Sequence, residues 1–178
     1  MSVDLRLITP DDAAATAELL RRDAAFLAPW EPEREEDFAT VEGQQRALER
    51  SLADHAAGLA VPWVVLEDGG IVGRITLFAV VRGALQSGTL GYWVTQARNG
   101  RGIATAAVAA ALRVAFGELG LHRVQADTLV HNVTSQRVLQ RNGFQRIGLA
   151  PQYLRIAGRW QDCYLHQRLA GPAGPSAQ

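Results

Sequence analysis

A glycine-rich junction between a strand and a helix constrains the fold of this chain more than any other segment. The junction reads Val94-Thr95-Gln96-Ala97-Arg98-Asn99-Gly100-Arg101-Gly102-Ile103-Ala104-Thr105. Gly100 and Gly102 remove side chains where the backbone must come close to another group. Arg98 and Arg101 add positive charge there, and the helix that begins here points its unpaired N–H groups back at the loop. The segment therefore predicts an anion-binding cradle, most naturally for a pyrophosphate.

The composition is that of an ordinary globular protein without global charge. The chain has 178 residues, of which 18 are basic and 18 acidic, so no net field draws it to nucleic acid or anionic lipid. Its single cysteine, Cys163, has no partner for an internal disulfide, which fits a reducing compartment. Asp4 and Arg6 interrupt the apolar pattern of the N-terminus, which therefore does not read as a signal peptide. We expect a cytoplasmic protein that binds neither nucleic acid nor membranes.

The hydrophobic periodicity predicts the element order β-α-α-β-β-β-α-β-α-β-β. Strands are expected near residues 5–7, 61–67, 71–81, 90–95, 123–130, 144–149 and 161–169. Helices are expected at 10–27, 40–57, 103–119 and 134–142. This order describes one mixed α/β domain over residues 1–170, with a sheet of about seven strands covered by four helices. A disordered tail is expected over residues 171–178.

A second segment, from Asn132 to Phe144, begins with Asn-x-x-Ser and ends with Asn-Gly-Phe. Together with the glycine junction, it closely resembles the GNAT superfamily of acyl-CoA-dependent N-acyltransferases. The first signature of that family is Arg/Gln-x-x-Gly-x-Gly/Ala, which residues 99–104 match except at the first position. Because Asn99 stands at that first position, backbone N–H groups must do more of the phosphate binding, with help from Arg98.

Four segments resemble the RimJ/RimL branch of this superfamily, which is named for acetylation of ribosomal-protein N-termini. They are Phe26 to Trp30, Leu90 to Val94, the Asn132 segment, and Tyr153 to Asp162. The resemblance covers nearly the whole chain. It implies the GNAT fold, with a mostly antiparallel sheet, and acetyl-CoA as the cofactor.

The resemblance also implies a set of cofactor-binding residues. The strand Tyr92-Trp93-Val94 is expected to pair with the pantetheine arm as if that arm were another strand, while the glycine loop binds the diphosphate. The predicted cofactor-binding residues are Trp93, Val94, Arg98, Asn99, Gly100, Arg101, Gly102, Ile103, Ala104, Thr105, Asn132, Ser135 and Arg141.

Asn132 and Ser135 are the predicted catalytic residues. In the RimJ/RimL branch the matching Asn lies beside pantetheine, and the matching Ser is placed to protonate the departing sulfur. Tyrosine does this in other branches, but none lies between Asn132 and Tyr153. The alternative interpretation is that Asn132 only caps a helix and Ser135 is only a first-turn hydroxyl. A backbone N–H near Trp93 or Val94 is the expected oxyanion donor.

The base and the acceptor pocket are less strongly specified. Many GNAT enzymes carry a glutamate on the central strand, where Thr89 stands here. The candidate bases are Glu31, Glu33, His131 and Asp162, each of which is also explained as a solvated loop charge or a turn partner. The acidic run from Glu31 to Asp37 would attract a protonated amine. The predicted substrate-binding residues are Trp30, Glu31, Tyr92, Tyr153, Trp160 and Asp162.

The predicted function is acetyl-CoA-dependent acetylation of a primary amine, with a protein or peptide N-terminal α-amine favoured as acceptor. Direct attack in a ternary complex is expected, because no histidine is evidently paired with Cys163 for a covalent route. A small-molecule amine or antibiotic as acceptor, and a non-catalytic CoA-binding sensor, stay open as alternatives. No metal site is predicted, since His55, His122 and His166 lack ligand spacing. A homodimer is compatible with the sequence.

Overall fold

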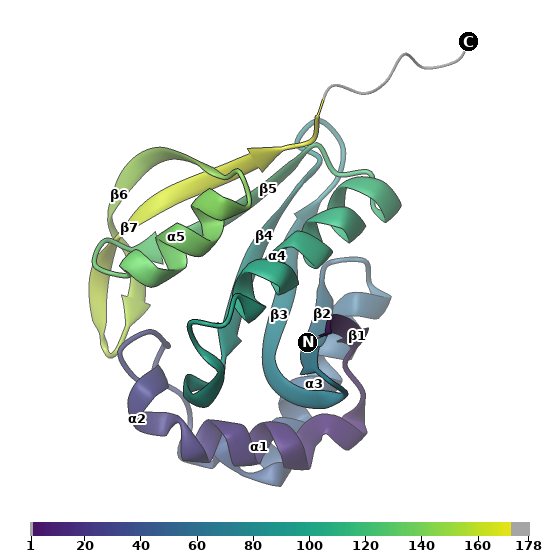
Figure 1. Cartoon of the computed structure of the whole chain (residues 1–178), viewed down its shortest axis with the longest axis vertical. Helices are drawn as coiled ribbons and strands as arrows, with labels where there is room; N and C mark the ends of the chain where they lie inside the picture. Colours follow the sequence, from purple (N-terminus) through teal and green to yellow (C-terminus); the bar gives the residue numbers. More distant parts are fainter. Residues whose placement is uncertain (1, 172–178) are drawn as a thin grey trace.

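A single seven-stranded sheet runs through the computed structural model, which describes residues 2–171 (Figure 1). Its strand order is β1-β2-β3-β4-β5-β7-β6. The strands are β1 (Val3–Leu7), β2 (Val61–Glu67), β3 (Gly70–Val81), β4 (Ser87–Val94), β5 (Arg123–Leu129), β6 (Gln145–Ile156) and β7 (Arg159–Leu169). The helices are α1 (Ala13–Arg22), α2 (Ala24–Leu27), α3 (Val41–Ala56), α4 (Ile103–Arg113) and α5 (Val133–Arg141).

The predicted element order is confirmed, with two local differences. The first expected helix is interrupted at Asp23, so that α1 and the short α2 are separate. Residues 150–160 were expected to lie outside the strands, but β6 and β7 continue through them as a long hairpin. Ala157 and Gly158 both have positive φ at its tip, the geometry of a tight hairpin turn. Pairing with β7 holds this segment extended despite two irregularities in β6.

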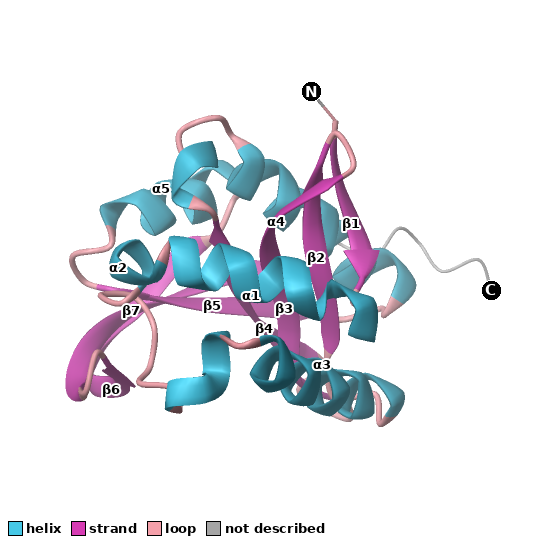
Figure 2. Ribbon diagram, turned by 90° about the horizontal axis from the view of Figure 1, so that it is seen from below, coloured by secondary structure: helices cyan, strands magenta, loops and turns pink. Residues whose placement is uncertain are grey.

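The helices cover both faces of the sheet, with α4 and α5 on one face and α1 and α3 on the other (Figures 1 and 2). Successive side chains of β2 point to opposite faces of the sheet, so this strand contributes to a hydrophobic core on each face. Trp63 and Val65 belong to the larger core, which α4 covers. Val64, between them, packs with Leu48 of α3 on the opposite face. The sheet is thus buried on both sides at its centre.

The sheet splits between β4 and β5, and this split positions the site. Within residues 2–171 these two strands are the only parallel pair, and they pair only at residues 87–89 with residues 123–125. Beyond that point no partner residues link Leu90–Val94 of β4 with Ala126–Leu129 of β5. The strands diverge there and leave a wedge in an otherwise continuous sheet.

The predicted tail lies outside the described residues except for Gly171, and the single-domain boundary at residue 170 stays a prediction. Within residues 2–171, none of the helices has the length and apolar character that crossing a membrane requires.

Candidate active site

The wedge between β4 and β5 holds a cavity of about 480 Å³, here called the wedge cavity. Its walls are the diverging ends of the two strands and the start of α5. Asn99 and Ala104 of the glycine junction line it from the α4 side, and Trp30 and Glu31 line it from the opposite face. The wedge cavity therefore connects the two faces of the sheet.

Backbone donors of β4 face this cavity. Residues of an antiparallel strand turn their N–H and C=O groups alternately to one side and the other. Thr95 donates its N–H to the Val72 carbonyl, on the β3 side, at 2.8 Å. The N–H group of Trp93, two residues earlier, also points toward β3. The N–H groups of Tyr92 and Val94 therefore point to the opposite side, toward the wedge, where β5 no longer pairs with β4. Of the two residues named for the oxyanion donor, Val94 has its amide on the wedge side.

The glycine loop leaves space for a ligand beside the first turn of α4. Gly100 and Gly102 have φ of +76° and +81°, and a Cβ added at either would meet nothing within 4 Å. Gly102 is the N-cap of α4, and no side chain accepts a hydrogen bond from the first amides of this helix. An α-helix leaves these N–H groups without internal partners, so they form an anion site.

The charged residues around the loop are placed differently from one another. Arg98 Nε forms an ion pair with the buried carboxylate of Glu67 at 3.0 Å, which ties the side chain to β2 while leaving it 42% exposed. Arg101 is exposed and has no ion pair among residues 2–171. Arg141 is exposed at the end of α5 and lines neither cavity described here. Ile103 is buried under the loop, and the Thr105 carbonyl accepts a hydrogen bond from Asn142 Nδ2 at 3.2 Å.

A pair of hydroxyl groups lies at the wedge. Ser135 Oγ is 2.8 Å from Tyr92 Oη, across 43 residues of sequence. Burial raises the pKa of Tyr92 to about 12, against the opposing effect of its hydrogen bond with Ser135. Both hydroxyls therefore carry their protons at neutral pH. The Asn132 side chain accepts a hydrogen bond from the Ser135 amide at 3.1 Å, so Asn132 does cap α5 while also lining the wedge cavity.

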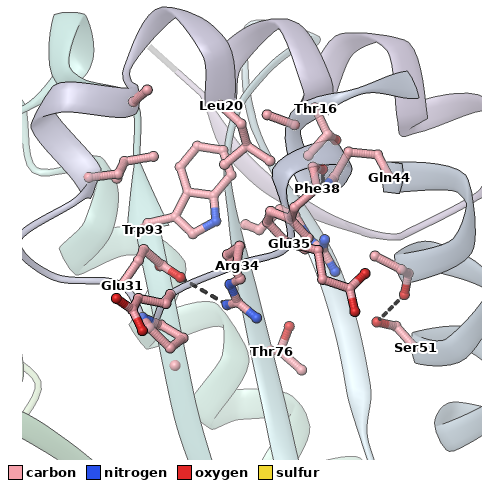
Figure 3. Close-up of a pocket in the computed structure, with 18 of the residues that line it drawn as sticks. Thr16, Leu20, Glu31, Arg34, Glu35, Phe38, Gln44, Ser51, Thr76 and Trp93 are labelled. Carbon is pink, nitrogen blue, oxygen red and sulfur yellow. Dashed lines mark hydrogen bonds and ion pairs between the residues drawn. The ribbon is translucent and has the colours of Figure 1, made fainter. Parts of the chain in front are cut away.

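Tyr92 and Trp93 send their side chains to opposite faces of β4. Tyr92, expected among the substrate-binding residues, lies on the α5 face with Ser135. Trp93, expected among the cofactor-binding residues through its backbone, places its indole on the α1 face, near Leu20 (Figure 3). The Trp93 side chain is therefore available to a ligand bound on the α1 face of the sheet.

A second and larger cavity, of about 870 Å³, lies on the α1 face and is here called the large cavity. It is lined by α1, α3, the segment from Glu31 to Phe38, and the faces of β3 and β4 (Figure 3). The two cavities share five lining residues: Leu27, Glu31, Gly91, Tyr92 and Trp93. They therefore meet over β4.

Only Glu31 among the four candidate bases lies where the cavities meet. Its carboxylate pairs with Arg34 at 2.9 Å (Figure 3). Glu33 pairs with Arg155 and is exposed, and His131 lies against the Trp30 ring at a centroid distance of 5.4 Å. Asp162 accepts a hydrogen bond from the Gln152 amide at 2.8 Å, so it is a turn partner.

The predicted aromatic walls of the pocket need correction. Trp30 lines the wedge cavity and packs against Leu129, Ile156 and Cys163. Tyr153 and Trp160 are 44% and 61% exposed and line neither cavity. They lie on the unexpectedly long β6–β7 hairpin, which carries their side chains to the surface.

Two polar residues of β5 in the wedge cavity were missed by sequence reasoning. The Thr128 hydroxyl is buried and has no hydrogen-bond partner among the described residues. Asp127 points to the opposite face of β5, and burial raises the pKa of its carboxyl group. Asp127 continues the polar series of Arg123 and Gln125. Thr128 instead interrupts the buried series of Val124 and Ala126, and such an interruption is the sequence signal.

Comparison with known proteins agrees with this geometry. A family model described as an acetyltransferase (GNAT) domain matches residues 3–145. The chain belongs to the GNAT acetyltransferase family. It is 33% identical over 160 residues to the ribosomal protein uS5-alanine N-acetyltransferase of Escherichia coli (strain K12), which covers 89% of this chain and 82% of that enzyme.

This chain is also similar in fold to solved structures of acetyltransferases. RimJ of Mycobacterium smegmatis, in complex with CoA-disulfide, is 37% identical, with a TM-score of 0.92 over 94% of this chain and 82% of that one. The Vibrio fischeri ribosomal-protein-S5-alanine acetyltransferase is 32% identical, with a TM-score of 0.91 over 98% and 97%. The chain is thus an acetyl-CoA-dependent N-acetyltransferase of the RimJ/RimL type, as predicted.

The residues present fit acetyl-CoA. The free amides at the start of α4 suit its diphosphate. The strand-edge N–H groups of Tyr92 and Val94, which have no partner strand at this point, suit its amide-rich arm.

Proposed function

We propose that this enzyme acetylates the N-terminal α-amine of a protein or peptide. The observation that carries the proposal is the large cavity, which opens onto β4 where the wedge cavity meets it. At about 870 Å³ it accommodates several residues of chain rather than an isolated amine. The names of the relatives, which are ribosomal-protein-alanine acetyltransferases, support the same class of acceptor.

An α-amine also suits the protonation chemistry of the site. Its pKa is about 7.7–8.0, so a useful fraction is neutral near pH 7, whereas a lysine amine has a pKa of about 10.4. Glu31 lies where the cavities meet, and we assign it to the incoming amine. Its carboxylate orients the ammonium form and accepts the proton, directly or through water, as the neutral nitrogen becomes the nucleophile.

Acetyl-CoA supplies an activated acetyl thioester when bound. The Val94 N–H, free on the wedge side of β4, donates to the carbonyl oxygen on which negative charge develops. Ser135 would supply the proton that the departing sulfur takes up, and Tyr92, 2.8 Å away, would return a proton to Ser135 and recover its own from solvent. The acetyl group passes directly to nitrogen. Cys163 is buried, and burial raises the pKa of its thiol, which disfavours a covalent route.

The test is acetyl transfer from acetyl-CoA to three acceptor panels, measured as thiol release and checked by mass spectrometry. The panels are peptides with a free α-amine and no lysine, the same peptides with a blocked α-amine and one lysine, and small amines including polyamines and aminoglycosides. We expect turnover with the first panel, exceeding the others by at least about tenfold in kcat/KM. Turnover confined to the small amines would establish the alternative acceptor, and CoA binding without turnover would indicate a sensor.

A further inference from the structure

Arg74 lies on the floor of the large cavity. It belongs to the central strand β3, where it is the partner of Trp93 on β4 and of Val64 on β2. Alternation places its side chain on the same face as Thr76 and Trp93, and all three line the cavity. Figure 3 shows Thr76, Trp93 and the Glu31–Arg34 pair around this space.

The guanidinium of Arg74 has no partner. Six other arginines form ion pairs with carboxylates: Arg6, Arg22, Arg34, Arg46, Arg98 and Arg155. Among the described residues, Arg74 makes neither an ion pair nor a side-chain hydrogen bond, although a guanidinium carries five N–H donors. Burial lowers the pKa of Arg74 and the positive charge of Arg34 lowers it further, and the more distant effects of Asp12 and Glu31, which raise it, do not restore its ordinary value.

A half-buried cation without a paired anion is energetically unfavourable. The position of Arg74 therefore indicates that a bound ligand supplies the anion. A guanidinium fork matches a carboxylate in a bidentate arrangement, which is stronger and more directional than a neutral hydrogen bond. Two carboxylates act on Arg74 through space, and each is already paired with another arginine: Asp12 with Arg6 and Glu31 with Arg34. The acidic residues Glu35, Glu36 and Asp54 are exposed, where salt screens them.

The position of Arg74 sets its distance from the reaction. It is one strand away from Trp93, about 5 Å in the hydrogen-bonding direction, on the side away from the wedge. Residues of both β4 and β3 line the large cavity, so an acceptor that extends into it from the wedge passes over Trp93 and then Arg74. Since an extended chain advances about 3.3–3.6 Å per residue, Arg74 lies within reach of the second to fourth residue.

We propose that Arg74 binds a carboxylate of the acceptor and so selects N-terminal segments that carry an acidic side chain within the first four residues. This inference rests on the proposed function, because it takes the occupant of the large cavity to be the acceptor. Arg74 is a specificity-determining residue in this account and takes no part in proton transfer.

The test compares amidated peptides that begin with alanine and carry Glu or Gln at position two, three or four. For the wild-type enzyme we expect kcat/KM to favour Glu by about tenfold or more at one of these positions. In Arg74→Gln this preference disappears, while kcat/KM for the Gln peptide changes by less than about threefold. Arg50→Gln is the matched control, because Arg50 is an exposed arginine lining the same cavity, and it keeps the preference.

Equal kcat/KM for Glu and Gln peptides at all three positions in the wild type would overturn the proposal. So would a preference that survives in Arg74→Gln, or an equal loss for both peptides with a lowered melting temperature, which would indicate a structural role. If no peptide is acetylated, the proposed function fails. Calorimetric titration of the Glu and Gln peptides into CoA-saturated wild-type and Arg74→Gln protein then decides the role of Arg74 by itself.

Discussion

At the scale of single residues, the hydroxyl pair at the wedge is the feature most directly tied to the chemistry. The resemblance to the RimJ/RimL branch predicts a role for Ser135 of α5, and its hydrogen-bond partner Tyr92 belongs to β4. Sequence spacing cannot reveal a contact across 43 residues, because the register of β4 against α5 is fixed by tertiary packing. The alternation of β4 nevertheless determines that Tyr92 and Trp93 serve opposite faces.

Replacing Ser135 by alanine tests its role as proton donor. We expect kcat to fall by about 10²-fold or more, since a positioned general acid contributes rate enhancement of that order. The KM for acetyl-CoA and the melting temperature should stay close to wild type, because the Ser135 backbone still donates to Asn132. Unchanged kcat in Ser135→Ala would mean that the hydroxyl only occupies the first turn of α5.

Glu31 and Asp127 are two carboxylates that the amine can meet, and paired variants separate them. We expect Glu31→Gln to lower kcat/KM for the acceptor by at least about tenfold, because the amide cannot accept the proton of the amine. Asp127→Asn should lower kcat/KM by less, since Asp127 lines only the wedge cavity and not the place where the two cavities meet. The reverse order of effects would move the proton acceptor from Glu31 to Asp127.

At the scale of elements, Asp23 joins the helical layer to the cofactor loop. This buried residue interrupts α1 and α2 and accepts hydrogen bonds from the Thr95 hydroxyl and from the Gln96 amide, the latter at 2.8 Å. It also pairs with Arg22 at 3.2 Å. Through these contacts, the end of β4 and the start of the glycine loop are held against the α1 face.

Changing Asp23 to Asn should therefore destabilise the fold and loosen the loop. Hydrogen bonds to a charged group contribute about 1.5–3 kcal/mol, so we expect a loss of about 2 kcal/mol in the free energy of unfolding and a raised KM for acetyl-CoA. Urea unfolding measures the first effect. Asp37→Asn is the control, since Asp37 forms an exposed ion pair with Arg46 and should change stability little. Equal stability of the two variants would contradict this role.

At the scale of the whole molecule, the order of elements and the cofactor loop could be predicted because they depend on local signals. Helix starts, hairpin turns and the glycines of residues 99–104 are all encoded within a few residues. The length of the β6–β7 hairpin, the pairing of Arg98 with Glu67 and the unpartnered Arg74 depend on contacts between distant segments. The sequence therefore predicts the conformation of the glycine loop better than the contacts that line the large cavity.

The stability of the whole fold should fall in acid. Burial works to raise the pKa of Asp12, but hydrogen bonds from Arg6 and Thr9 outweigh it, and the pKa is lowered. A lowered carboxyl pKa contributes stability above the unfolded value of about 3.9, and this is lost as pH falls through the folded value. We expect Asp12→Asn to be less stable than wild type at pH 7 in urea unfolding, and the difference to shrink below about pH 4. A difference that is the same at both pH values would contradict this linkage.

Calorimetric titration with acetyl-CoA, comparing Gly102→Ala with Gly69→Ala, tests the central claim most directly. Both glycines have positive φ, +81° and +85°, with nothing within 4 Å of an added Cβ, so both variants carry similar backbone strain. The account predicts exothermic binding by the wild type and by Gly69→Ala, and affinity at least about tenfold weaker in Gly102→Ala. Absence of binding by folded wild-type protein, or equal affinity in the two variants, would contradict it.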